Sequence, residues 1–319
     1  MVTTAGLRVV FFGTPDFAVP SLDALLASRH QVVAVVTQPD RPRGRGHKTT
    51  IGPVKARAEA AGVPILQPER LKDQLFLDAL TAPGADLGVV AAYGKILTDA
   101  VLATPRLGMV NVHASLLPRH RGAAPVHRAI IAGDTETGVT IMRVVKALDA
   151  GPMLAKVSRA IGPNDTSDEV ERDLASKGAA LLIETIDALT EGRAREIPQI
   201  DADATYAHRL TKDDGLVDWS RPAEAIHNQI RGLHPWPHAF TFARGQRLIL
   251  HRSAPGDSDV EGVAPATIVE AAGDRIVVGT GTGLLNLLVV QVEGKRPMAA
   301  REFLAGHPLT AGERFTAVP

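Results

Sequence analysis

The chain has 319 residues, of which 45% are apolar and 22% charged, and its 35 basic residues balance 35 acidic ones. This composition excludes a disordered chain, and zero net charge excludes a uniformly basic nucleic-acid binder. The absence of cysteine excludes disulfides, cysteine-ligated zinc, iron–sulfur clusters and cysteine nucleophiles. The apolar runs are too short for a signal peptide or a membrane span, so we expect a cytoplasmic protein.

The first half of the chain alternates short apolar runs with helical patterns. The expected strands are Val9–Phe12, Val32–Thr37, Leu87–Ala92, Met109–His113 and Val139–Val144. The expected helices are Ser21–Ser28, Pro53–Ala61, Thr98–Ala103 and Thr166–Thr190. Continuous apolar runs separated by helices are typical of parallel strands buried on both faces. We predict an α/β domain over residues 1–196, with a doubly wound, mostly parallel, Rossmann-like sheet.

The pattern changes after Arg193. Residues 197–207 are expected to form a linker, and Asp218–Leu233 allows a short helix. The expected strands that follow are Phe240–Phe242, Arg247–Leu250, Ala266–Glu270, Arg275–Gly279 and Leu287–Val292. Short strands punctuated by glycines predict a small C-terminal β-barrel over residues 208–319.

Several familiar cofactor motifs are missing. The first turn, Gly13-Thr14-Pro15-Asp16, lacks the glycine spacing of a dinucleotide-binding fingerprint, and the sequence has no Walker A motif. His113, His120 and His127 recur every seven residues, but they fall on an expected strand, loop and helix without a metal-ligand spacing. We therefore expect no nicotinamide cofactor and no metal.

Two polar residues end the strand expected at Met109–His113. Residues two apart on a strand share a face, so Asn111 and His113 point the same way, at the carboxyl end where open α/β sheets bind ligands. An amide donor beside an imidazole suits acyl transfer, because the amide stabilises an oxyanion and histidine moves a proton. A hydrogen-bonded pair within the core is the alternative. Asp149, before Gly151-Pro152, is either a turn residue or the carboxylate that orients His113.

Two loops are candidates for binding. Ser115–Arg121 contains Pro118 and precedes a helix expected to begin near Val126, so it is either a ligand loop or a plain strand–helix connection. Arg41 to Arg57 contains six cations and no acid. Such a stretch suits phosphate contacts, with a solvated surface loop as the alternative.

These motifs together resemble the methionyl-tRNA formyltransferase family. The resemblance covers nearly the whole chain. In the first half it rests on Phe12-Gly13-Thr14-Pro15-Asp16-Phe17, Thr37-Gln38-Pro39-Asp40-Arg41-Pro42, Ala92-Tyr93-Gly94, Asn111-Val112-His113, Ser115-Leu116-Leu117-Pro118, Arg121-Gly122-Ala123-Ala124-Pro125 and Thr137-Gly138-Val139-Thr140-Ile141-Met142. In the second half it rests on Asp218-Trp219, Pro235-Trp236-Pro237 and Gly283-Leu284-Leu285-Asn286-Leu287-Leu288.

The resemblance implies formyl transfer from 10-formyltetrahydrofolate to the amino group of initiator methionyl-tRNA, by a monomer without a metal. It implies Asn111, His113 and Asp149 as the catalytic residues. It places folate on Ser115, Leu116, Leu117 and Pro118, and the tRNA acceptor end on Arg41, Arg43, Arg45 and Lys48. The C-terminal domain is expected to contact tRNA.

Two positions depart from the family pattern. Ala114 stands where a glycine is common, and Pro152, which lacks a backbone donor, follows Gly151. Neither departure removes a proposed catalytic group. The alternatives are a formyltransferase for sugar nucleotides or a formyltetrahydrofolate hydrolase on the same fold, and, in another class, a non-catalytic RNA-binding protein.

Overall fold

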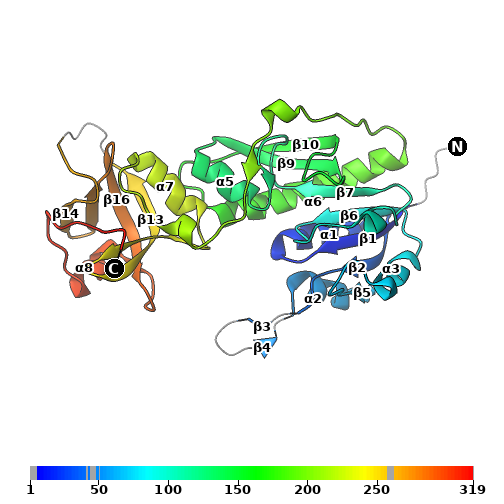
Figure 1. Cartoon of the computed structure of the whole chain (residues 1–319), viewed down its shortest axis with the longest axis horizontal. Coiled ribbons are helices and arrows are strands. Elements are labelled where there is room, and N and C mark those ends of the chain that lie inside the picture. Colours follow the sequence, from blue (N-terminus) through cyan, green and yellow to red (C-terminus); the bar gives the residue numbers. More distant parts are fainter. Residues whose placement is uncertain (1–5, 41, 44–47, 50, 257–261, 319) are drawn as a thin grey trace. The chain divides into compact units, whose positions relative to one another are not determined.

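The computed structural model describes residues 6–40, 42–43, 48–49, 51–256 and 262–318 (Figure 1). The chain divides into two compact units, which are described separately. The first contains residues 1–125, 136–159 and 171–207, and the second contains residues 126–135, 160–170 and 208–319.

The first unit is built on a seven-stranded sheet in the order β10-β9-β7-β6-β1-β2-β5. Its strands are β1 (Arg8–Gly13), β2 (Gln31–Val36), β5 (Ile65–Leu66), β6 (Leu87–Ala91), β7 (Met109–His113), β9 (Glu136–Arg143) and β10 (Met153–Ala160). Two-stranded pairs are formed by β3 (Pro42–Arg43) with β4 (Lys48–Thr49), and by β8 (Arg121–Gly122) with β11 (Tyr206–Ala207).

Along the sequence, the helices that accompany these strands are η1 (Asp16–Ala18), α1 (Val19–Ala27), α2 (Pro53–Ala60), α3 (Gln74–Thr81), α4 (Asp99–Leu102), α5 (Pro125–Ala132), α6 (Ser167–Thr190) and η2 (Asp201–Asp203). Helix α5 beyond Pro125 and the start of α6 fall in the second unit. Their starts follow local chemistry. Thr98 caps α4 by accepting a hydrogen bond from the Val101 amide at 3.4 Å. Before α6, the Thr166 amide donates to the Glu169 carboxylate at 2.9 Å, as in a capping box.

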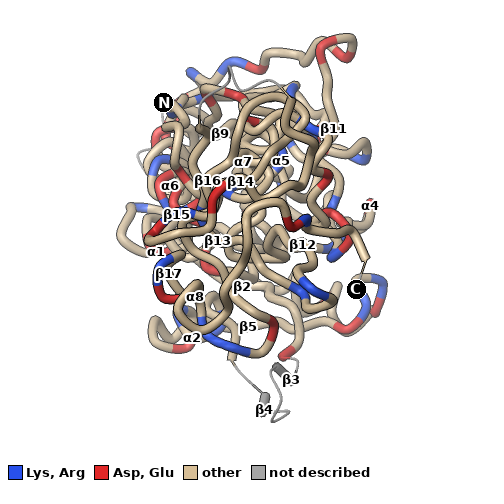
Figure 2. The backbone as a smooth tube through the Cα atoms, turned by 90° about the vertical axis from the view of Figure 1, so that its left-hand side faces the viewer, with Lys and Arg blue, Asp and Glu red and all other residues tan. Residues whose placement is uncertain are grey.

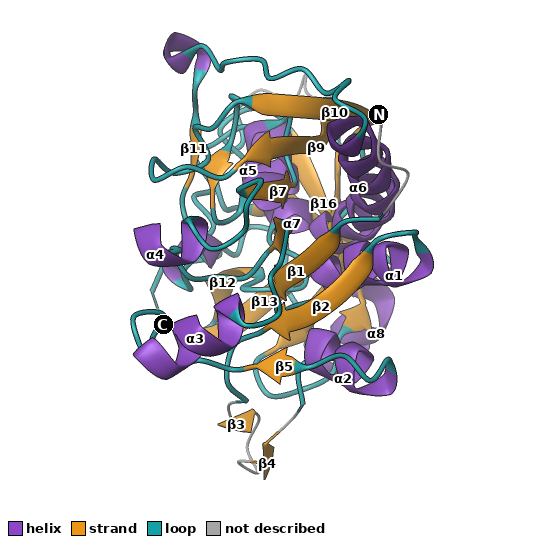
Figure 3. Cartoon of the chain, turned by 90° about the vertical axis from the view of Figure 1, so that its right-hand side faces the viewer, coloured by secondary structure: helices purple, strands orange, loops and turns teal. Residues whose placement is uncertain are grey.

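The predicted doubly wound, mostly parallel sheet is confirmed. Strand β1 pairs in parallel with β2 on one side and with β6 on the other, so the strand order reverses at β1. Figure 3 shows β1, β2 and β5 lying side by side. Residues Val9 to Phe12 of β1 are 0% exposed, as expected for a strand covered on both faces. Strand β7 also pairs in parallel with β6, and only its other neighbour in the described sheet, β9, is antiparallel to it.

Helix α6 approaches the sheet closely at Gly178. A Cβ atom built on Gly178 would lie 2.9 Å from Val112 of β7 and 3.2 Å from Val139 of β9. Glycine is therefore required where this helix covers the strand that carries Asn111 and His113.

The second unit is a six-stranded antiparallel sheet. Its strands are β12 (Ala239–Ala243), β13 (Gln246–Pro255), β14 (Ile268–Ala272), β15 (Arg275–Gly279), β16 (Leu284–Val292) and β17 (Met298–Ala299), and its helices are η3 (Asp213–Gly215), α7 (Ala223–Gly232) and α8 (Ala300–Gly306). The sheet runs β12-β13-β16-β15-β14, and β17 pairs with β16. Near the C-terminus, Thr316 bridges Phe242 of β12 and Arg314 bridges Thr267 beside β14. This segment therefore closes the sheet into the predicted small barrel.

The division into units differs from the sequence boundaries in two ways. Residues 197–207, expected as a linker, belong to the first unit, where β11 pairs with β8. Residues 126–135 and 160–170 belong to the second unit. The change at residue 208 coincides with the expected start of the C-terminal domain.

Charge is mixed along the backbone. Figure 2 shows Lys and Arg interspersed with Asp and Glu along the coloured part of the chain. This matches the zero net charge of the sequence. Within the described ranges, no helix combines the length and apolar character needed to cross a bilayer.

Candidate active site

The carboxyl end of β7 carries the polar pair expected from the sequence. Val110 and Val112 are buried at 0% and 2% exposure, so they face the packed side of the strand. Asn111 is partly buried and pairs with Met142 of β9. His113 is 5% exposed, and its Nε2 atom lies 3.0 Å from the carbonyl oxygen of His120. Because a carbonyl only accepts, Nε2 carries the proton and the neutral ring has its lone pair on Nδ1.

Asp149 lies on the Nδ1 side of His113. Its Oδ2 atom is 3.8 Å from Nδ1, so the two groups are close without being directly hydrogen-bonded. The same oxygen accepts a 2.8 Å hydrogen bond from the Gly122 amide. Asp149 has a backbone φ of 46°, an uncommon left-handed conformation for a residue other than glycine. Two residues that are distant in the sequence therefore lie close together in the fold.

The amide that binds Asp149 belongs to the short pair β8–β11. Gly122 has a φ of +123°, and a Cβ atom there would lie 2.7 Å from the carbonyl oxygen of Ala207. The Arg121 amide donates to the Thr205 carbonyl at 2.8 Å, and the Ala123 amide donates to the Ala207 carbonyl at 2.9 Å. This close backbone pairing fixes the Gly122 N–H that points at Asp149.

Gln199 holds the Asp149 turn from its backbone side. Its side-chain amide donates 2.8 Å hydrogen bonds to the carbonyls of Asp149 and Gly151. Its oxygen accepts a 3.0 Å hydrogen bond from Nε of Arg121, which is itself 3% exposed and pairs with Asp201 at 2.8 Å. Sequence reasoning missed Gln199, because residues 197–207 were expected to be a linker.

The three histidines that recur every seven residues have separate environments. His120 has a φ of 58°, and its carbonyl receives the His113 hydrogen bond. His127 lies on α5, where burial lowers its pKa to about 4. His113, His120 and His127 do not form a metal-ligand group in the described part of the chain.

The comparisons with known proteins agree with one another. The family model described as formyl transferase matches residues 7–186, and the model described as formyl transferase, C-terminal domain, matches residues 209–308. A methionyl-tRNA formyltransferase from Moorella thermoacetica is 47% identical over 307 residues, covering 96% of this chain and 98% of that protein. The chain belongs to the methionyl-tRNA formyltransferase family.

Two solved structures of other proteins share the fold at lower identity. An N-formyltransferase from Helicobacter canadensis, in complex with folinic acid and dTDP-3-aminofucose, has a TM-score of 0.65 at 17% identity and covers 88% of this chain and 99% of that one. HypX from Aquifex aeolicus, in complex with tetrahydrofolic acid, has a TM-score of 0.63 at 14% identity. That match covers 97% of this chain and 50% of HypX.

The loop that family resemblance assigns to folate is ordered by its own polar groups. Ser115 is 0% exposed, and its hydroxyl donates to the Arg119 carbonyl at 2.6 Å. The hydroxyl of Thr140 donates to the Ser115 carbonyl at 2.7 Å and accepts from the Leu117 amide at 3.1 Å. Leu117 packs with Met142 and Met153. Ser115 and Leu117 therefore shape the loop, and Leu116 and Pro118 are its more exposed members.

Residues from three motifs in the first half of the chain lie close together at the ends of β1, β2 and β6. The hydroxyl of Thr14, after β1, donates to the Tyr93 carbonyl at 3.3 Å. The side-chain amide of Gln38, after β2, donates to the same carbonyl at 2.8 Å. Tyr93 follows β6, is 2% exposed, and has its pKa raised to about 12 by burial. These motifs therefore tie together the carboxyl ends of three strands.

The basic stretch assigned to tRNA is described only in part. Arg43 and Lys48 pair across β3 and β4, whereas Arg41 and Arg45 lie outside the described residues. The last two cations of the stretch are paired with acids, Lys55 with Asp40 and Arg57 with Asp23. The Lys55 ammonium holds the pKa of Asp40 below its ordinary value. Two of the six cations of the stretch are therefore neutralised by acidic residues that come from elsewhere in the sequence.

Proposed function

We propose that this chain transfers the formyl group of 10-formyltetrahydrofolate to the amino group of initiator methionyl-tRNA, with Asn111, His113 and Asp149 as its catalytic residues. The main support is that His113 and Asp149 lie 3.8 Å apart at the carboxyl end of β7. The chain that carries them belongs to this family. Ligands bind at that end of open α/β sheets. The formyl donor enters as a co-substrate, and the reaction uses no metal.

The reaction is a direct acyl transfer. The neutral amine of methionine attacks the formyl carbon, a C–N bond forms, and negative charge develops on the formyl oxygen. The bond from that carbon to N10 of folate then breaks. The amine loses one proton and N10 gains one, so the products are formyl-methionyl-tRNA and tetrahydrofolate.

The geometry suggests how His113 and Asp149 handle the proton. With the proton of His113 on Nε2, both Nδ1 and the Asp149 oxygen are acceptors. Two acceptors 3.8 Å apart fit one shared donor, such as the attacking amine or a water molecule. Once Nδ1 takes a proton, the imidazolium beside Asp149 stabilises the oxyanion together with the Asn111 amide.

The substrates are assigned to two segments. Folate lies against the loop of Ser115, Leu116, Leu117 and Pro118, and the tRNA acceptor end lies against Arg41, Arg43, Arg45 and Lys48. Clustered cations bind phosphate backbones without reading base identity, so this stretch supplies affinity for tRNA. The C-terminal unit contributes further tRNA contacts. In this proposal the protein acts as a cytoplasmic monomer.

A formyl-transfer assay with radiolabelled donor tests the function. Initiator methionyl-tRNA, elongator methionyl-tRNA and a dTDP-linked amino sugar are offered side by side, with a reaction lacking any acceptor. The proposal predicts label on initiator methionyl-tRNA. Label on the amino sugar alone, or release of formate without an acceptor, would establish one of the rival activities. Binding of tRNA with no effect of folate would indicate a non-catalytic RNA-binding protein.

A further inference from the structure

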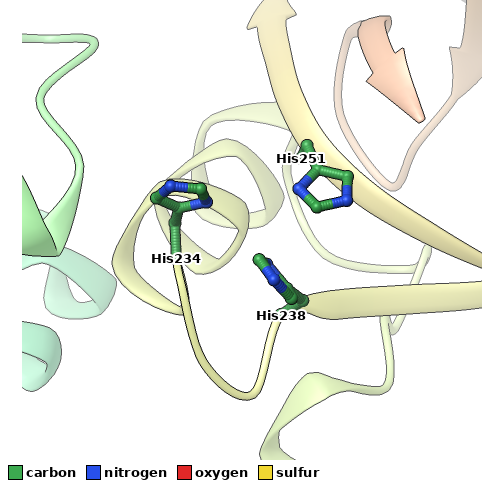
Figure 4. A group of neighbouring side chains, drawn as sticks. All are labelled: His234, His238 and His251. Carbon is green, nitrogen blue, oxygen red and sulfur yellow. The ribbon is translucent and has the colours of Figure 1, made fainter. Parts of the chain in front are cut away.

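Three histidines of the C-terminal unit turn their rings toward one another. His234 follows α7, His238 precedes β12, and His251 lies within β13. Figure 4 shows the three rings around one small space. The ring centroids of His238 and His251 are 4.5 Å apart, and His234 lies 5.4 Å from the first and 6.2 Å from the second. One nitrogen from each ring lies within 4.8 Å of the other two.

Two ring nitrogens of this cluster are unsatisfied. The Nδ1 atoms of His234 and His238 are buried and have no hydrogen-bond partner among the described residues. An unsatisfied buried polar atom costs about 1–3 kcal/mol, so two in one cluster call for an explanation. A bound cation shared by both rings provides one.

Polar side chains lie near the Nε2 atoms of two rings, and one of them, Gln291, is within hydrogen-bond distance. Nε2 of His251 lies 2.7 Å from Oε1 of Gln291, and Nε2 of His234 lies 3.9 Å from a carboxylate oxygen of Asp168. An amide oxygen only accepts, so the His251 proton is on Nε2 and its lone pair is on Nδ1. Carboxylates and amides in this outer position orient the histidine ligands of metal sites.

We propose that His234, His238 and His251 bind one divalent transition-metal ion of the Zn²⁺ type. Three imidazole nitrogens leave a fourth tetrahedral position for water. Tetrahedral Zn–N bonds of ~2.0–2.1 Å place ligand nitrogens about 3.3 Å apart, so small ring movements complete the site. The ion links the segment after α7 to β13, and it stabilises the C-terminal unit. The proposed formyl transfer does not use it.

Metal binding to the full-length chain tests this inference. The protein is prepared without a histidine tag, stripped with a chelator and titrated with Co²⁺ and then Zn²⁺. We expect one Co²⁺ per chain, with the visible absorption of a tetrahedral cobalt site, displacement by Zn²⁺, and a rise in melting temperature with Zn²⁺. Absence of saturable binding at about 100 µM metal, a level that exceeds the Kd of ordinary three-histidine zinc sites, would overturn the proposal.

Single substitutions locate the site. His238→Gln and His234→Gln should each weaken binding by at least about 100-fold. His307→Gln is the control, because His307 lies in the same unit, stacked on Phe303, outside the cluster. The stripped His238→Gln variant should melt close to the stripped wild type, because neither protein then has bound metal to lose. If that variant fails to fold, His234→Gln carries the test. Unchanged Co²⁺ affinity in a folded cluster variant would contradict the proposal.

Discussion

The side-chain amide of Gln199 donates a 2.8 Å hydrogen bond to the backbone carbonyl of Asp149, 50 positions earlier in the chain. A second hydrogen bond of the same length reaches Gly151. Together with the Gly122 amide on the carboxylate, they hold a residue whose φ of 46° is unfavourable in isolation. The position of the Asp149 carboxylate therefore depends on residues well outside the motif that contains it.

Gln199→Ala is expected to lower turnover by about tenfold and the free energy of unfolding by about 1–3 kcal/mol. Three hydrogen bonds are lost, two to the carbonyls of Asp149 and Gly151 and one from Arg121, each contributing about 1 kcal/mol. Small displacements of a catalytic group also reduce rates strongly. Single-turnover kinetics and urea unfolding measure the two effects. Gln74→Ala, at an exposed position on α3, serves as the control. A loss of stability with wild-type turnover would show that Gln199 has no part in positioning Asp149.

Gly122→Ala is expected to remove most activity and to destabilise the protein by about 2 kcal/mol or more. A φ of +123° is strained for any side chain, and the new Cβ atom would push against the Ala207 carbonyl, 2.7 Å away. Gly62→Ala is the matched control: its φ is +67°, with no described atom within 4 Å of a Cβ atom. That change should cost only about 1 kcal/mol and leave activity unaltered. Equal activity of the two variants would contradict the role given to Gly122.

The buried strands were predictable, because runs such as Val9–Phe12 are apolar throughout and each is followed by a helical pattern. Strand β10 was missed, since its burial alternates and its apolar residues are spread among polar ones. Short elements such as β5 and α8 were not predicted either, because a few residues are too short a stretch to show a periodic apolar pattern.

At the site, strand alternation alone predicts that Asn111 and His113 share a face of the strand. The approach of Asp149 followed only from family resemblance, since it depends on a tertiary turn. Gln199 gave no usable signal. Gly122 belongs to a family motif, but its hydrogen bond to Asp149 could not be predicted, because it depends on the β8–β11 pairing between distant segments.

Replacing Arg43 and Arg45 with alanine is expected to weaken the use of tRNA and to flatten its dependence on salt. Each phosphate contact removed lowers the slope of log K against log salt by about one unit or less. Folate binding should be unchanged. The control is the double variant Lys72→Ala/Lys177→Ala, which removes the same charge from exposed positions. Filter binding over a range of salt concentrations measures the slope, and an identical slope in all three proteins would make the basic stretch an ordinary surface.

Acid is expected to destabilise the protein through His127. The unfolded side chain takes up its proton near pH 6.5, whereas burial lowers the folded pKa to about 4. Between these values the unfolded state binds more protons than the folded state. The free energy of unfolding therefore decreases as the pH is lowered from 6.5 to 4, by at most about 3 kcal/mol from this residue. His127→Gln should flatten the decline between pH 7 and 4 in urea titrations, whereas His208→Gln, at an exposed position, should not. Parallel pH curves for wild type and His127→Gln would refute this origin.

Single-turnover formyl transfer to methionyl-tRNA, compared between the wild type and Asn111→Ala, tests the proposed catalytic site most directly. Removing one oxyanion donor typically costs about 2.7–4 kcal/mol, so the rate should fall by roughly two to three orders of magnitude. Folding should change little, because Asn111 is only partly buried. A rate for Asn111→Ala close to that of the wild type would exclude this amide from the reaction and contradict the proposed site.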